Sequence, residues 1–136
     1  MDGLFVPNIS FGAPVISALR KDSGMFFDVH LMIVDPDRYV EDFVKAGADL
    51  ITIHYESCED PLAVIRHIRA LGVKAAVAIK PATDVSVLYP LLSEIDMALI
   101  MTVEPGFGGQ KLIPYTIEKV RALRAYAKEN GHGIDI

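Results

Sequence analysis

Short apolar segments recur along the chain and alternate with segments whose apolar residues have helical spacing. The apolar segments lie at residues 26–33, 49–55, 73–79 and 96–103. Parallel strands need crossover connections, and a helix between successive strands is the usual one. Apolar residues occupy both faces of each expected strand, as they do in parallel sheets covered on both sides. The pattern therefore predicts an α/β fold built from consecutive βα units.

Capping residues mark the boundaries of two of the expected helices. Asp35 and Asp60 each precede a proline, which places a capping side chain before a proline at the first helical position. Gly47 and Gly72 provide the matching stop signals. We therefore expect one helix between each Asp-Pro pair and the glycine that follows it.

Apolar stripes at helical spacing indicate which helix faces pack against the core. The helix that ends at Gly72 has the stripe Leu62, Ile65, Ile68 and Leu71. A weaker helix is expected over residues 84–92 and a longer one over residues 114–130. The stripe of the longer helix is Ile117, Val120, Leu123 and Tyr126. Such stripes are typical of core packing rather than of cofactor binding.

At both ends of the chain the pattern stops within an element. Residues 1–3 resemble the end of a strand that passes into a loop, and residues 134–136 begin an alternating strand. Natural domain boundaries normally lie in exposed loops. We therefore expect residues 1–136 to be a single incomplete domain, a fragment of a longer protein.

Composition and charge narrow the classes of function. The 136 residues are 51% hydrophobic, which is enough for one domain with a buried core. The apolar runs are strand-length and no secretory leader opens the chain, so we expect a cytoplasmic protein without a membrane partner. The net charge is −5, with 13 basic residues scattered among 18 acidic ones, which argues against a nucleic-acid partner. The single cysteine, Cys58, has no disulfide partner and is expected to be chemically idle.

A glycine-rich segment follows the fourth apolar run. Residues 101–111 read MTVEPGFGGQK. Gly106, Gly108 and Gly109 lack Cβ atoms and permit positive φ, so the loop can turn successive N–H groups toward one anion. The spacing alone leaves a tight turn before the next helix equally open, since the loop is neither a Walker loop nor a GxGxxG fingerprint.

Four segments together resemble the ribulose-phosphate 3-epimerase family. They are MDGLFVPNISFG at residues 1–12, FFDVHLMI at 26–33, VAIKP at 77–81 and the glycine-rich segment at 101–111. The resemblance covers essentially the whole chain, and the first and last segments in combination are highly specific. It implies a partial (β/α)8 TIM barrel of the ribulose-phosphate-binding type, with about units 3–6 and remnants of units 2 and 7.

The resemblance also implies an isomerase reaction and a sugar-phosphate substrate. The family interconverts D-ribulose 5-phosphate and D-xylulose 5-phosphate in the pentose phosphate pathway. Two aspartates transfer the proton at carbon 3 through an enediolate, and a divalent metal cation (zinc, iron, manganese or cobalt) acts as a Lewis acid.

The chain carries neither of the two aspartates that the resemblance implies. The first lies in an HxDxMDG motif, of which this chain begins at the M, and the second lies in a VDGG segment beyond Asp135. Asp2 and Asp135 lie near these positions and do not match them. We therefore expect no catalytic residue in this chain and no activity from the chain alone.

Several residues are assigned a role by the resemblance. His30 matches a histidine that binds the catalytic metal, although a histidine in an apolar strand is by itself more often a hydrogen-bonded core residue. The expected substrate-binding residues are His30, Gly106, Phe107, Gly108 and Gly109. An apolar wall around the substrate carbons is expected from Met1, Met32 and Met101. Such a wall would shield a reactive intermediate from water, although these are ordinary core methionines on the sequence alone.

Other polar residues at strand ends leave alternatives open. His54 and Glu56 alternate onto one face of the second apolar run, which would suit acid/base chemistry or a ligand pair. We favour a buried hydrogen-bonded pair that closes the barrel mouth, because the family's metal ligands do not come from this strand. Lys80 is suited either to balancing a phosphate or to simple solvation. His67 and His132 are assigned no role.

Two alternative functions remain. One is a non-catalytic half-barrel fragment, and the other is an epimerase of a six-carbon ketose phosphate such as allulose 6-phosphate. An open arc of a barrel would expose two sheet edges and an apolar interior. We therefore expect self-association through these edges, or a homo-oligomer.

Overall fold

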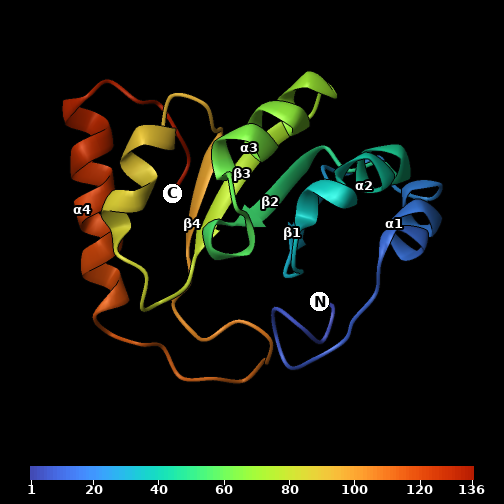
Figure 1. Cartoon of the computed structure of the whole chain (residues 1–136), viewed down its shortest axis with the longest axis horizontal. Coiled ribbons are helices and arrows are strands. Elements are labelled where there is room, and N and C mark those ends of the chain that lie inside the picture. The colour runs from blue at the N-terminus through green and yellow to red at the C-terminus, as the bar shows by residue number, and fades with distance from the viewer.

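The computed structural model describes all 136 residues, and its centre is a four-stranded parallel sheet (Figure 1). The strands are β1 (Asp28–Leu31), β2 (Leu50–His54), β3 (Lys74–Ile79) and β4 (Met97–Ile100). Their order in the sheet is β1-β2-β3-β4, and every neighbouring pair is parallel. Sequential parallel neighbours are the arrangement of consecutive barrel units, so the prediction of a partial (β/α) barrel is confirmed.

Helices form a row around the outside of this sheet, from α4 at the left of Figure 1 to α1 at the right. The α-helices are α1 (Ala13–Arg20), α2 (Val40–Ala46), α3 (Pro61–Ala70) and α4 (Thr116–Glu129). Three 3-10 helices complete the set: η1 (Pro36–Arg38), η2 (Tyr55–Ser57) and η3 (Val85–Leu91). None of the helices has the length and apolar character that spanning a membrane requires.

The predicted capping signals are confirmed at one Asp-Pro pair and wrong at the other. The Asp60 side chain accepts a hydrogen bond from the Ala63 N–H at 3.1 Å and so caps α3. Asp35 instead has φ 48°, caps nothing with its side chain and precedes the 3-10 helix η1. Aspartate tolerates this left-handed conformation better than most residues. The α-helix therefore begins only at Val40.

Two further elements differ from the sequence prediction. Residues 85–91 form the 3-10 helix η3 rather than an α-helix, and Pro90 lies inside it. Proline removes a backbone donor and its ring clashes with the preceding helical turn, which opposes a regular α-helix. The helix α1 was not predicted, although Pro14 at its start is an ordinary helix-initiating signal.

The stripe of α3 packs as predicted, with Ile65 and Ile68 fully buried and the two flanking leucines partly buried against the core. In α4 the buried face is turned from the predicted one. Leu123 is fully buried as expected, but Thr116 and Ala127 take the deep positions and Ile117 is only half-buried.

The two middle strands are buried almost throughout, whereas the outer strands are buried on one face only. Alternate residues of β1 and β4 are partly or fully exposed, so the prediction that both faces of every strand are buried is wrong for these two strands. His30 lies on the partly exposed face of β1 and pairs in register with Thr52. His54 lies two residues beyond Thr52, on the same face. The register thus places both histidines on one face of the sheet.

The expected start of a strand at the C-terminal end is present as an isolated bridge. Asp135 pairs in parallel with Met97 at the outer edge of β4. The Ala98 N–H donates to the Asp135 carbonyl at 2.9 Å, and the Asp135 N–H donates to the Asp96 carbonyl at 3.1 Å.

Candidate active site

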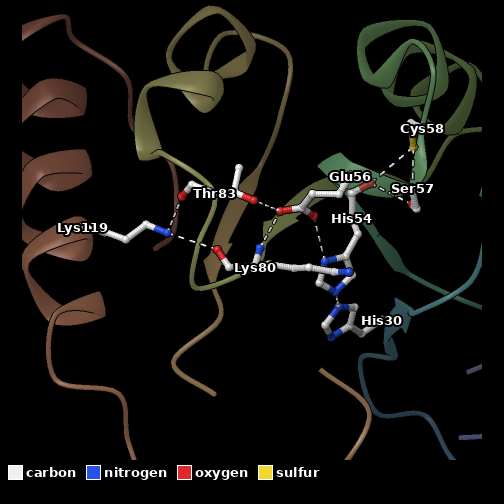
Figure 2. A network of polar contacts seen from close by, with 8 residues as sticks. All are labelled: His30, His54, Glu56, Ser57, Cys58, Lys80, Thr83 and Lys119. Carbon is white, nitrogen blue, oxygen red and sulfur yellow. Dashed lines mark hydrogen bonds and ion pairs between the residues drawn. The ribbon is translucent and has the colours of Figure 1, made fainter. Parts of the chain in front are cut away.

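The carboxyl ends of the parallel strands bring polar residues from distant segments together. His30 lies within β1, His54 ends β2 and Lys80 directly follows β3. Figure 2 shows these residues joined with Glu56 and Thr83 in one network. This edge of the sheet is where (β/α) barrels build their active sites.

The centre of the network is a chain of three side chains. His30 Nε2 lies 2.9 Å from His54 Nε2, and His54 Nδ1 lies 3.3 Å from Glu56 Oε2. The His54 side chain is fully buried, and its ring also packs against Phe5 with the ring centroids 4.8 Å apart. His54 and Glu56 therefore form a hydrogen-bonded pair as we favoured, but only His54 is buried, since the Glu56 side chain is 20% exposed. The pair also contacts His30 through His54.

Glu56 is held by donors from the segment that follows β3. Its Oε1 accepts hydrogen bonds from the Lys80 N–H at 2.7 Å and from the Thr83 hydroxyl. Burial opposes ionisation of this carboxyl. The hydrogen bonds from His54, Thr83 and the Lys80 N–H outweigh that effect and lower its pKa to about 2. Glu56 is thus a carboxylate at neutral pH.

His30 is a neutral imidazole beside an open cavity. Burial, and then the neighbouring His54 and the amino terminus, lower the pKa of His30 to about 4. His30 lines a cavity of about 1070 Å³ together with Met1, Asp2 and Met32. The structure therefore brings together one expected metal ligand and two of the three expected wall methionines.

The third expected wall residue, Met101, lies elsewhere. It follows β4, is 9% exposed and does not line this cavity. The glycine-rich residues Gly106, Phe107, Gly108 and Gly109 do not line it either.

The glycine-rich loop packs instead against the N-terminal segment. The Asn8 side-chain amide donates to the Gly106 carbonyl at 3.0 Å. Gly106 has φ 115°, and a Cβ there would lie 3.1 Å from the Val6 Cβ. Gly109 also has positive φ, whereas Gly108 does not. The two most specific segments of the sequence therefore lie side by side.

Both oxygens of the Asp2 carboxylate accept hydrogen bonds from the backbone. Its Oδ1 accepts from the Leu4 and Phe5 N–H groups, each at 2.9 Å, and its Oδ2 accepts from the Val34 N–H at 2.7 Å. Burial opposes ionisation, but these hydrogen bonds lower the pKa of Asp2. Asp2 thus fastens the N-terminal segment to the loop after β1, in a structural role.

Lys80 places a cation near the network. Its Nζ lies 4.1 Å from the centroid of the Phe5 ring, a cation–π geometry. Since Phe5 also contacts His54, the ammonium group is held over the same end of the sheet.

Lys119 was missed by the sequence analysis. Its Nζ donates to the carbonyl oxygens of Lys80, Pro81 and Thr83 at 3.1, 2.9 and 2.5 Å. Burial lowers its pKa, an effect that the nearby Glu56 and Asp84 oppose. No local pattern in the sequence could have found it, because the buried face predicted for this helix did not include its neighbour Thr116.

The remaining candidate residues, Cys58 and His67, take no part in the side-chain contacts that join His30 to Glu56. Burial raises the pKa of the Cys58 thiol to about 11, so it is protonated at neutral pH. His67 Nδ1 contacts Asp37 at 2.7 Å on the surface. No group of three or more histidine, cysteine, aspartate or glutamate residues is arranged to hold a metal ion.

Comparison with known proteins gives one consistent result. A model of the ribulose-phosphate 3 epimerase family matches residues 1–136. The ribulose-phosphate 3-epimerase of Candida glabrata is 51% identical over 140 residues, covering 91% of this chain and 57% of that protein. The Bacillus subtilis enzyme of the same name is 44% identical, covering 96% and 60%. The rice (Oryza sativa subsp. japonica) cytoplasmic isoform is 48% identical, covering 91% and 56%. The chain thus spans less than two thirds of the length of these curated relatives.

Proposed function

The chain belongs to the ribulose-phosphate 3-epimerase family, and we propose that it forms part of the active site of an isomerase that interconverts D-ribulose 5-phosphate and D-xylulose 5-phosphate. The observation that carries this proposal is the family match over all 136 residues, together with the convergence of its motifs at the carboxyl ends of the strands. The catalytic unit is then a complete barrel to which this chain contributes four central strands.

In this proposal His30 supplies one ligand to a divalent metal cation. An imidazole nitrogen is a common ligand of zinc and iron, so His30 fits one position of such a site. About three protein ligands are usual at a catalytic centre, and no group of three or more histidine, cysteine, aspartate or glutamate residues of this chain is arranged to hold a metal ion. When bound, the metal would stabilise the negative charge that develops on the substrate oxygens.

The other residues hold the substrate. Met1 and Met32 line the cavity beside His30 and are proposed to form the apolar wall that excludes water from the reacting carbons. Met101 follows β4, outside that cavity, and is proposed to extend the wall from there. The loop residues Gly106, Phe107, Gly108 and Gly109 are proposed to bind the sugar phosphate through backbone N–H groups.

Proton transfer at carbon 3 is assigned to two aspartates outside residues 1–136. The family pattern places both in segments that this chain does not contain. Asp2 is no substitute, because both of its oxygens already accept backbone hydrogen bonds. We therefore propose that this chain alone is catalytically inactive.

We further propose a cytoplasmic location and association of the chain with itself. The rice relative is named as a cytoplasmic isoform. The N-terminal segment exposes large apolar side chains, including Leu4 at 83%, Ile9 at 76% and Phe11 at 63%. An exposed apolar patch of this kind favours association.

A coupled assay for xylulose 5-phosphate tests the proposal. It compares residues 1–136 alone with a chimera in which these residues replace the matching segment of the Bacillus subtilis relative. We expect no turnover above the buffer rate from the chain alone and chelator-sensitive turnover from the chimera. Chelator-insensitive activity of residues 1–136, or a folded chimera without turnover, would contradict the proposal.

A further inference from the structure

We propose that the ammonium group of Lys80 contacts an anionic oxygen of the substrate, at the end of the sheet where the strands have their carboxyl ends. The inference rests on the proposed function and deepens it, because that function assigns no role to Lys80. A sugar phosphate carries anionic oxygens on its phosphate group, and negative charge also develops on the oxygens of the reacting carbons. An ammonium group forms charge-assisted hydrogen bonds with either kind of oxyanion.

The register of the sheet places Lys80 on the same face as His54. His54 of β2 pairs with Ala78 of β3, and Lys80 lies two residues beyond Ala78, directly after the strand. Side chains two residues apart along a strand lie on the same face. Figure 2 shows the Lys80 side chain extending from the end of β3 toward His54. Lys80 therefore faces the residues of the candidate active site.

Both backbone groups of Lys80 are held in place by hydrogen bonds. Its N–H donates to Glu56 Oε1 at 2.7 Å, and its carbonyl accepts from the Lys119 Nζ at 3.1 Å. The first partner belongs to the 3-10 helix after β2, and the second belongs to α4. The fold therefore fixes the point from which the Lys80 side chain leaves the backbone.

The tip of the Lys80 side chain is held by an aromatic ring. Its Nζ lies 4.1 Å from the centroid of the Phe5 ring, and the Phe5 and His54 ring centroids are 4.8 Å apart. A cation–π contact attracts the ammonium group without using its N–H groups in conventional hydrogen bonds. The lysine thus keeps its three donors for a ligand that enters beside Phe5 and His54.

The ammonium group of Lys80 has no anionic partner within the chain. Its side chain is only partly exposed, and it forms no ion pair and no hydrogen bond. The carboxylate of Glu56 is close but already engaged, by the Lys80 N–H and the Thr83 hydroxyl at Oε1 and by His54 at Oε2. Charges that are partly withdrawn from water are normally paired. An oxyanion of the substrate would supply the missing counter-charge.

Lys74 provides the matched control, because it begins the same strand that Lys80 follows. Its Nζ also lies over an aromatic ring, 5.7 Å from the Phe26 centroid. Lys74 is exposed and lies at the amino end of β3, the opposite end of the sheet from His54. Methionine at either position keeps an aliphatic stem and removes the charge. A comparison of Lys80→Met with Lys74→Met therefore isolates the effect of where the charge lies.

Titration of residues 1–136 with inorganic phosphate tests the oxyanion site without any turnover. The lysine Cε–Hε resonances are followed by ¹³C–¹H NMR at constant ionic strength, and Lys80→Arg assigns the Lys80 resonance. We expect the Lys80 resonance to shift saturably in the millimolar range of phosphate and the Lys74 resonance not to shift. A Lys80 resonance that does not respond, or that responds only as Lys74 does, would overturn the inference.

Kinetics of the chimera with the Bacillus subtilis relative show which substrate oxygen is contacted. We expect Lys80→Met to lower kcat/KM by at least about 10-fold, Lys80→Arg to lower it less, and Lys74→Met to leave it within about 2-fold. A higher KM with weaker inhibition by inorganic phosphate assigns the contact to the phosphate group. A lower kcat with an unchanged KM assigns it to the oxygens of the reacting carbons.

The two measurements separate this inference from the proposed function. A phosphate-induced shift at Lys80, together with a folded chimera that has no turnover, supports the oxyanion site and contradicts the epimerase function. Turnover of the chimera that Lys80→Met changes no more than Lys74→Met does supports the function and contradicts the inference. The titration of the wild-type chain decides even where Lys80→Met does not fold.

Discussion

At the scale of single residues, Gly106 is a glycine at which both the backbone and the surroundings oppose a side chain. Its φ is 115°, and a Cβ would lie 3.1 Å from the Val6 Cβ in the adjoining N-terminal segment. Gly108, two residues away, has no positive φ and no atom within 4 Å of a Cβ. The glycine-rich loop thus packs closely against the N-terminal segment at Gly106 and not at Gly108.

We expect Gly106→Ala to lower the free energy of unfolding by about 1–3 kcal/mol, because the side chain strains the backbone and presses on Val6. Gly108→Ala serves as the control and is expected to change it by less than about 0.5 kcal/mol. Urea unfolding followed by circular dichroism measures both. Equal effects of the two substitutions would show that the loop does not depend on close contact with the N-terminal segment.

Glu56 gives the stability of the chain a defined dependence on pH. Its pKa falls from 4.5 to about 2 in the folded chain. The folded state therefore binds the proton less readily than the unfolded state, so the stabilisation is complete above about pH 4.5 and is lost as the pH falls toward 2. After allowance for the 20% exposure of the side chain, this contribution is about 1–2 kcal/mol.

The prediction is tested by denaturant unfolding of the wild-type chain and Glu56→Gln between pH 7 and pH 3. We expect the wild-type chain to be more stable by about 1–2 kcal/mol at pH 7, and this difference to shrink as the pH falls below 4.5. A difference that stays constant over this range would mean that the Glu56 carboxyl is not perturbed by its neighbours.

At the scale of elements, Lys119 connects α4 to the segment that follows β3. Its ammonium group donates to three carbonyl oxygens of that segment. Lys119→Met keeps the aliphatic stem and leaves these carbonyls without their donor, which is expected to lower the free energy of unfolding by about 2 kcal/mol or more. Lys128→Met, at an exposed position of the same helix, is the control, with less than about 0.5 kcal/mol expected. If calorimetry gave similar losses of unfolding free energy for Lys119→Met and Lys128→Met, this role of Lys119 would be contradicted.

Elements were predictable from the sequence where periodicity and local chemistry point to the same structure. The four strands lie inside their apolar segments, and Asp60 caps α3 as its spacing indicates. A local signal alone did not decide the outcome, because the same Asp-Pro pattern caps a helix at Asp60 and fails at Asp35. Asp35 adopts a left-handed conformation instead of capping, and η3 contains a proline and does not become an α-helix.

The candidate site was predictable only in part, for a different reason. His30, His54 and Glu56 are recognisable as polar residues in or next to apolar strands, but their hydrogen bonding depends on the register between β1 and β2. Lys119 is 39 residues from the Lys80 carbonyl that it contacts. No local pattern reports such a contact, because it follows from how α4 docks beside the sheet.

At the scale of the whole molecule, the sheet has two outer strands and an exposed apolar segment at its N-terminal side. The apolar residues involved are Leu4, Ile9, Phe11, Met25 and Phe26, each more than half exposed. Surfaces of this kind drive association. We expect the purified chain to self-associate in sedimentation velocity, and the double substitution Leu4→Ser with Phe11→Ser to reduce that association. A monomeric wild-type chain that binds no apolar dye would contradict the expectation.

The central claim, that this chain brings His30 into the catalytic site of an epimerase, is tested most directly by isotope exchange. The measurement is deuterium incorporation at carbon 3 of ribulose 5-phosphate in D2O, catalysed by the chimera with the Bacillus subtilis relative. We predict exchange by the chimera, a loss of at least about 100-fold in His30→Gln, and no change in His132→Gln as the control. Exchange that persists undiminished in His30→Gln would contradict the claim.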